Sequence, residues 1–136
     1  MIPVNDWRVD FDERYPIFRQ VANHFSRSLV KRELYPGDRI PSIRELSMAL
    51  KVNTNTIQRA YQEMERDKLI YSQRGTGYFV MEDERIVERI KKTMVSETMS
   101  HFLEEMRALG FCNAEILSEL KSHLREGDDK LDANDD

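Results

Sequence analysis

The amino-acid sequence predicts a mainly α-helical fold with a small β-hairpin, arranged as an N-terminal winged helix-turn-helix followed by a C-terminal two-helix appendage. Apolar residues recur at helical spacing on both sides of residues 69–80, where strand-forming residues flank two glycines. Before this hairpin, two short amphipathic segments are separated by Lys51-Val52-Asn53. A helix, a short helix, a three-residue turn, a helix and a hairpin follow one another as in a winged helix-turn-helix, although such layouts also occur in purely structural domains.

Composition limits the class of protein. The chain has 136 residues, of which 40% are hydrophobic, enough for one small core. A single cysteine, Cys112, excludes an internal disulfide, and no spacing of Cys or His matches a zinc site. The N-terminus lacks a signal-peptide pattern, and no apolar run is long enough to span a bilayer. We therefore expect a cytoplasmic protein with no membrane association, metal or cofactor.

Charge is divided unevenly along the chain, whose formal net charge is −4. Residues 1–80 hold 13 Lys and Arg against 10 Asp and Glu, a balance of +3, whereas residues 81–136 hold 8 against 15, a balance of −7. The acidic total argues against non-specific coating of nucleic acid, but it allows a local basic docking face in the N-terminal part.

The first helix should follow a short extended arm, residues 1–14. Pro16 suits the first helical position, because its missing N–H needs no partner there. The helix should end near Glu33, before the Pro-Gly turn at residues 36–37. Its apolar stripe has four-residue spacing and consists of Ile17, Val21, Phe25 and Leu29.

The next two helices carry start signals. Ser42 and Glu45 have the spacing of a capping box, in which each side chain accepts a hydrogen bond from the other residue's backbone N–H. Asn53 or Thr54 can cap the following helix, which should end near residues 67–68. Residues 69–71 and 78–80 should then pair as strands. The inward stripe of the helix before them is Ile57, Ala60, Tyr61 and Met64.

A helical period returns from Glu84 to Leu109, with Gly110 as its C-terminal cap. A shorter helix should end at Gly127, and the acidic residues after it have little to bury, so they predict a disordered tail. The predicted domains are therefore a winged helix-turn-helix over 1–81, a helical dimerisation region over 82–126 and an acidic tail over 127–136. The stripe of Met94, Met99 and Met106 with Phe102 could line an effector pocket, but more often such a stripe belongs to a core or a dimer interface. The residues assigned to dimerisation are Ile86, Ile90, Met94, Met99, Phe102, Leu103, Met106, Leu117 and Leu120.

The outward face of the helix after residue 53 carries the functional signal. Thr54, Asn55 and Gln58 are uncharged there. Asn and Gln can pair bidentately with adenine, which is worth about 1–3 kcal/mol of discrimination. Arg44 and Arg59 flank this face and could meet phosphates, which orient a protein without reading sequence. Without a role in binding, the polar residues would be a solvated helix start. Arg44 and Arg59 would then form surface ion pairs, each worth at most about 1 kcal/mol.

The segment from Pro16 to Val80 resembles the DNA-binding domain of GntR-family bacterial transcription regulators. The specific motifs are PGDRIPSIREL at 36–46 and RGTGYFV at 74–80, and the recognition helix begins with NTNTIQRAY at 53–61. That beginning, and FLEEMRALGF followed by a brief helix, are most similar to the YtrA subfamily. The resemblance implies a homodimeric regulator, most simply a repressor of transporter genes, bound to a pseudo-palindromic operator in double-stranded DNA. It leaves an unknown small-molecule effector open.

Carried over by position, the family's DNA contacts fall on the supporting helix, the recognition helix and the wing. Many relatives have a basic residue or Pro where Thr54 stands, Arg where Gln58 stands, and Ser where Cys112 stands. The operator of this chain is therefore expected to be its own. The predicted DNA-binding residues are Ser42, Arg44, Asn53, Thr54, Asn55, Thr56, Gln58, Arg59, Arg74, Gly75, Thr76 and Gly77.

Two other function classes compete with this prediction. Winged helices also mediate protein contacts, so a protein-interaction module without sequence-specific DNA binding is the alternative. An enzyme is not expected, because the sequence shows no paired carboxylates, no nucleophile–base pair and no phosphate-cradling loop before a helix.

Overall fold

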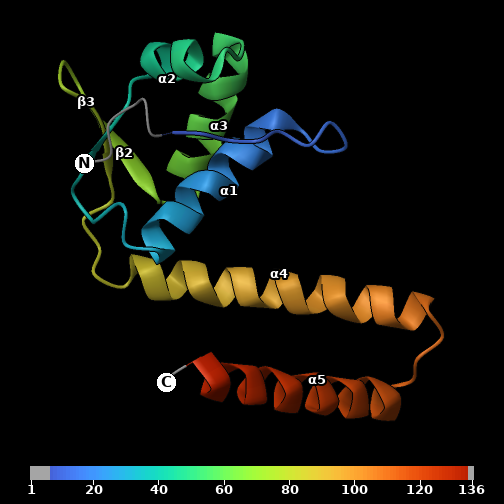
Figure 1. The fold of residues 1–136 in the computed structure, drawn as a ribbon. Coiled ribbons are helices and arrows are strands. Elements are labelled where there is room, and N and C mark those ends of the chain that lie inside the picture. The colour runs from blue at the N-terminus through green and yellow to red at the C-terminus, as the bar shows by residue number, and fades with distance from the viewer. Residues whose placement is uncertain (1–6, 135–136) are drawn as a thin grey trace. The chain divides into compact units, whose positions relative to one another are not determined.

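The structure is a computed structural model that describes residues 7–134, with side chains described for residues 7–127. Five helices and one three-stranded sheet form in this range (Figure 1). The chain divides into two compact units, Met1–Lys91 and Lys92–Asp136. The predicted class, a winged helix-turn-helix followed by C-terminal helices, is confirmed. Among the described residues, no helix is both long and apolar enough to cross a membrane.

Three helices form most of the first unit: α1 (Ile17–Val30), α2 (Ile43–Leu50) and α3 (Thr54–Arg66). α3 packs against both α1 and α2. The four residues predicted to face inward from α3 are at most 1% exposed, which confirms the predicted stripe. Full burial of one large apolar side chain stabilises a fold by about 1.5–3 kcal/mol, so this face anchors α3.

The end of α1 differs from the prediction. The helix stops at Val30 instead of continuing to Glu33, and Arg32 takes a left-handed backbone conformation with φ 61°. The backbone N–H of Glu33 then donates to the carbonyl of Ser28 at 2.9 Å. This early exit brings Leu34 into the core, where it is fully buried. Helix propensity alone predicts a later end for α1, and the earlier end coincides with the burial of Leu34.

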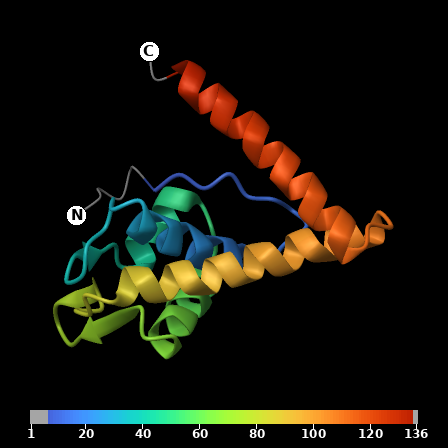
Figure 2. The same cartoon turned by 90° about the horizontal axis from the view of Figure 1, so that it is seen from below.

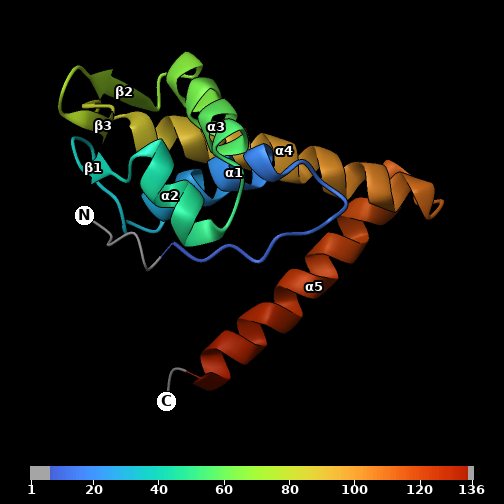
Figure 3. The ribbon, with the colours of Figure 1, turned by 90° about the horizontal axis from the view of Figure 1, so that it is seen from above.

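The sheet has one more strand than predicted. β2 (Ile70–Gln73) and β3 (Gly77–Val80) form the predicted hairpin, and β1 (Arg39–Ile40) pairs antiparallel with β3. Figure 3 shows β1 beside β3, on the side away from β2, in agreement with the order β1-β3-β2. A strand of two residues has no period of its own, so no pattern in the sequence predicts it.

Tyr61 joins three parts of the first unit. Its ring meets Tyr78 of β3 edge-on, with centroids 4.9 Å apart. Its hydroxyl donates to the backbone carbonyl of Pro41, just before α2, at 2.5 Å. Burial raises the pKa of the Tyr61 phenol far above its usual value, so the hydroxyl keeps its proton and remains a donor.

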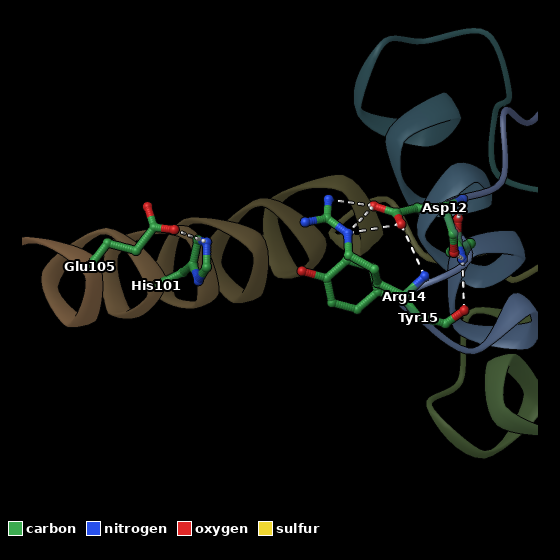
Figure 4. A network of polar contacts seen from close by, with 6 residues as sticks. Asp12, Arg14, Tyr15, His101 and Glu105 are labelled. Carbon is green, nitrogen blue, oxygen red and sulfur yellow. Dashed lines mark hydrogen bonds and ion pairs between the residues drawn. The ribbon is translucent and has the colours of Figure 1, made fainter. Parts of the chain in front are cut away.

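The segment before α1 is attached to that helix by side chains at both of its ends. Trp7 is buried and stacks on Phe25. The Gln20 amide accepts from the N–H of Asp12 and donates to its carbonyl, both at 2.8 Å. Figure 4 shows the Arg14 guanidinium on the Asp12 carboxylate, a contact that lowers the pKa of Asp12 to about 2. The first six residues of the predicted arm lie outside the described residues.

The second unit is built from α4 (Ile86–Ala108), whose first residues belong to the first unit, and α5 (Asn113–Asn134). Gly110 has φ 93° in the turn between them, as its predicted capping role requires. Figures 2 and 3 show α5 diverging from α4 beyond this turn. Over the described residues, the two helices share no extended interface.

α5 begins with an incomplete capping arrangement and ends later than predicted. Hydrogen bonds from Cys112 lower the pKa of Glu115, whose Oε1 accepts from the Cys112 backbone N–H at 3.1 Å. At the other end, the predicted stop at Gly127 is wrong, because the helix continues to Asn134. Up to that residue the predicted disordered tail is helical, and residues 135–136 lie outside the described range. One Gly costs a helix only about 1 kcal/mol, and no Pro follows.

The division between the two units falls after Lys91, within α4, and not after residue 81. Ile86 is 0% exposed and Ile90 is 5% exposed. The first turns of α4 therefore belong to the core of the first unit, although the sequence assigned both residues to a dimer interface.

Replacing Tyr61 by Phe should lower the free energy of unfolding by about 1–3 kcal/mol, because the buried carbonyl of Pro41 would lose its donor. Tyr35 is exposed, so Tyr35→Phe is the matched control and should change stability by about 0.5 kcal/mol at most. Urea denaturation followed by circular dichroism measures both values. Equal losses in the two variants would contradict the role given to the Tyr61 hydroxyl.

Candidate nucleic-acid interface

The predicted capping box at the start of α2 is present. The N–H of Glu45 donates to Ser42 Oγ at 3.0 Å, and the N–H of Ser42 donates to Glu45 Oε1 at 3.4 Å. Ser42 therefore supports the helix, whatever else its hydroxyl contacts. Arg44 lies in the first turn of α2 with an exposed side chain. The same turn thus combines a structural cap with an exposed cation.

At the start of α3, one residue caps the helix and the residues after it present exposed polar side chains. Asn53 is the N-cap, and its Oδ1 accepts from the N–H of Asn55 at 2.8 Å. The side chains of Thr54, Asn55 and Gln58 are exposed, whereas Thr56 is half-buried. The uncharged surface predicted at this end therefore consists mainly of three exposed side chains, placed where a helix also has partial positive charge.

Arg59 is oriented by an aromatic ring. Its guanidinium lies over the Phe18 ring of α1, with Cζ 4.0 Å from the ring centroid. Glu63, one turn further along α3, forms an ion pair with Arg66 at 3.8 Å. A guanidinium over a ring keeps its N–H groups in the plane, so Arg59 is held in place while it can still donate to an anion.

The turn between β2 and β3 presents Arg74, Gly75 and Thr76, all exposed. Gly77 opens β3 with φ 127°, a conformation open to glycine but not to ordinary residues. A methyl group on Gly77 would lie 3.4 Å from Nε of Arg39. The Arg39 guanidinium thus runs along the wing beside Gly77.

Arg39 is exposed and was not among the predicted site residues. It comes to the wing because β1 pairs with β3, with Arg39 opposite Phe79. A basic residue in PGDRIP was visible in the sequence, but the strand register that carries it to the wing was not.

These groups gather within one unit. Figure 1 shows α2, the start of α3 and the loop between β2 and β3 toward the same end of that unit. This end offers uncharged amides and hydroxyls on α3, with arginines from α2, α3 and the wing around them. Such a surface can hydrogen-bond to base edges while cations meet phosphates.

The described residues offer no competing metal chemistry. Within that range, no group of three or more His, Cys, Asp or Glu residues is placed to hold a metal ion. Cys112 is a free, exposed thiol. His101 and His123 lie near glutamates of their own helices, such as Glu105 at 3.3 Å from His101 (Figure 4).

The residues predicted for dimerisation fall into two groups. Ile86 and Ile90 are buried within the single chain and have little surface left for a second copy. The others lie on α4 and α5 with exposed or half-exposed side chains, and Leu117 is 53% exposed. Exposed apolar residues outside the predicted set extend this surface: Val95, Leu109 and Leu124.

Comparisons with known proteins identify the family to which this sequence is similar. The family described as bacterial regulatory proteins, gntR family, matches residues 18–80. The chain is 39% identical to the uncharacterized HTH-type transcriptional regulator YhcF of Bacillus subtilis, over 86% of this chain and 97% of that protein. It is 31% identical to the HTH-type transcriptional repressor YtrA of Bacillus subtilis, over 75% of this chain and 74% of that protein.

A solved structure is similar over almost its whole length. It is a GntR family transcriptional regulator from Listeria monocytogenes, with a TM-score of 0.73 and 36% sequence identity. The match covers 82% of this chain and 98% of that one.

Gly77→Ala should lower the free energy of unfolding by about 1–3 kcal/mol, because alanine is strained at this φ. Gly75→Ala is the matched control, since φ there is 77° and nothing lies within 4 Å of an added methyl group. Chemical denaturation should rank Gly77→Ala as the more costly change. The opposite order would contradict the backbone strain assigned to an alanine at position 77.

Proposed function

The chain belongs to the gntR family of bacterial regulatory proteins, in its short YtrA-like form, and from that premise we propose that it represses transcription as a homodimer on a pseudo-palindromic operator. Family membership makes it a DNA-binding transcriptional regulator and not an enzyme. It also favours DNA over the alternative of a protein-interaction module.

One observation carries the proposal of sequence-specific reading. α3 buries one face completely and presents Thr54, Asn55 and Gln58 at its N-terminal end on the other. A recognition helix contacts base edges with its early positions. Positively charged side chains would add attraction to any DNA, whereas amides and hydroxyls distinguish bases by donor and acceptor pattern. We assign base reading to these three residues.

Phosphate contacts are assigned to the cations around α3. Arg44 is exposed at the start of α2, Arg59 is held over Phe18, and Arg74 is exposed on the wing. We add Arg39 because it runs along the wing beside Gly77. Each phosphate neutralised steepens the fall of affinity with salt by about 0.9 in a double-logarithmic plot.

Dimerisation is supported by apolar side chains that one chain leaves uncovered. Val95 and Met99 on α4, and Leu117 and Leu124 on α5, are all exposed. The two helices share no extended interface over the described residues, so these apolar side chains remain exposed to solvent in the single chain. A second copy of the same unit would cover them. It would bring a second recognition helix to the next major groove, about 34–36 Å away.

Repression is the part of the proposal that rests on relatives. A protein 31% identical to this chain is named a transcriptional repressor, and the simplest mechanism is occlusion of a promoter. Control of transporter genes rests on the resemblance to the YtrA subfamily. A drug-sized pocket needs about 300–1,000 Å³, which is large for the two C-terminal helices of one subunit. A small-molecule effector would therefore most readily bind between the two subunits.

Arg44→Ala should weaken binding to every sequence and reduce the slope of log affinity against log salt by about 1. Gln58→Ala should instead relax the base preference at one base pair per half-site, and the lost discrimination should be about 1–3 kcal/mol. Fluorescence anisotropy of the full chain against DNA from its own upstream region, with single-base variants, measures both effects.

Two variants serve as controls for that titration. Arg66→Ala removes an exposed cation from the opposite end of α3, and Asn23→Ala removes an exposed amide from α1, so neither should alter binding. An unchanged base preference in Gln58→Ala would end its assignment as a reader. Wild-type binding that ignores sequence at moderate salt would overturn the proposed operator specificity.

Leu117→Glu should convert the dimer to a monomer and weaken operator binding at least tenfold, on the order expected when two linked half-sites become separate. Ser118→Glu places the same charge one residue further along α5, where the side chain is also exposed, and should leave the dimer intact. Analytical ultracentrifugation reports the mass of each variant. A dimeric Leu117→Glu variant would show that the interface lies elsewhere.

A further inference from the structure

Arg89 of α4 reaches back to the end of α3. Its Nη1 donates to the backbone carbonyl of Asp67 and its Nη2 donates to that of Lys68, both at 2.9 Å. The residues are more than twenty positions apart in sequence, and all belong to the first unit. The contact therefore connects the recognition helix directly with the helix that leads to the proposed dimerisation surface.

One of the two carbonyls belongs to the C-cap of α3, and the other belongs to the residue that follows it. Asp67 is the C-cap of α3, and Lys68 follows with a left-handed φ of 59°. The last carbonyl groups of a helix have no partner within it and carry partial negative charge. A guanidinium supplies two N–H donors in a fixed fork as well as a positive charge. Arg89 thus matches the end of α3 in both geometry and charge.

The same part of α4 is also held by burial. Ile86 and Ile90, which lie one helical turn apart on either side of Arg89 in the sequence, are buried in the first unit. Apolar burial is non-directional, so it favours contact without selecting one rotation of the helix. Two hydrogen bonds from one planar group do select a rotation, because both donors must reach their carbonyls at once.

We propose that Arg89 is a positioning residue that fixes the direction of α4 against the recognition helix and so sets the half-site spacing that the dimer accepts. This inference rests on the proposed dimeric binding to two half-sites. Arg89 is exposed, so its hydrogen bonds add little to stability. Their effect is on orientation: without them, α4 can turn about Ile86 and Ile90, and the two recognition helices lose their fixed separation.

The test uses the full chain and DNA duplexes that carry its half-site, selected from a random pool, as inverted pairs. The distance between the two half-sites is varied one base pair at a time, and a duplex with one half-site serves as reference. Arg89→Ala should keep its affinity for the single half-site and remain dimeric. Its discrimination between the best spacing and one base pair more or less should fall about tenfold, within the usual range of coupling between sites.

Two further variants separate positioning from charge and from general damage. Arg89→Lys keeps the charge, but a single ammonium does not reproduce the fork, so it should restore only part of the spacing discrimination. Arg85→Ala removes an exposed arginine one turn earlier in the chain and should behave as wild type. Thermal unfolding of all variants checks that the fold is retained.

The outcomes distinguish this inference from the proposed function. If wild type discriminates spacings and Arg89→Ala does so equally well, the positioning role is wrong while dimeric binding stands. A loss of single-half-site affinity in Arg89→Ala as large as its loss of spacing discrimination would also overturn it, by assigning Arg89 to the DNA-binding unit itself. If wild type accepts all spacings alike, the dimeric mode fails, and the inference fails with it.

Discussion

The burial of one face of α3 is the constraint on which the rest of the first unit depends. Ile57, Ala60 and Met64 are covered by the packing against α1 and α2, while Tyr61 also reaches the chain before α2 and the ring of Tyr78 on β3. Because these contacts use the whole inner face, the outer face carries no part of the core. The helix can therefore be held rigidly by residues that never touch a ligand.

The sequence predicted those elements whose signals are local, and missed those that depend on distant partners. The capping box of Ser42 and Glu45, the cap at Asn53 and the buried stripe of α3 all follow from spacing within a few residues, and the structure confirms them. β1 exists only because β3 lies beside it, and α1 ends early as Leu34 enters the core. Neither cause is visible in a short window of sequence.

The candidate site shows the same limit at the level of side chains. Spacing placed Thr54, Asn55 and Gln58 outward, as the structure has them. It did not show that Arg59 would lie over Phe18, or that strand pairing would bring Arg39 beside Gly77. It also assigned the apolar Ile86 and Ile90 to an interface, because apolar spacing along one helix does not say which neighbour covers each turn.

At the starts of α2 and α3, capping residues and exposed residues are different side chains, which has a consequence for how such regulators diverge. Asn53 and Ser42 spend side-chain oxygens on helix caps, so changing either one weakens a helix by about 1 kcal/mol. Thr54, Asn55 and Gln58 are exposed, and most exchanges at such positions alter stability by about 0.5 kcal/mol or less. Under the proposed base reading by these three residues, a lineage can therefore change its operator without first acquiring a more stable fold.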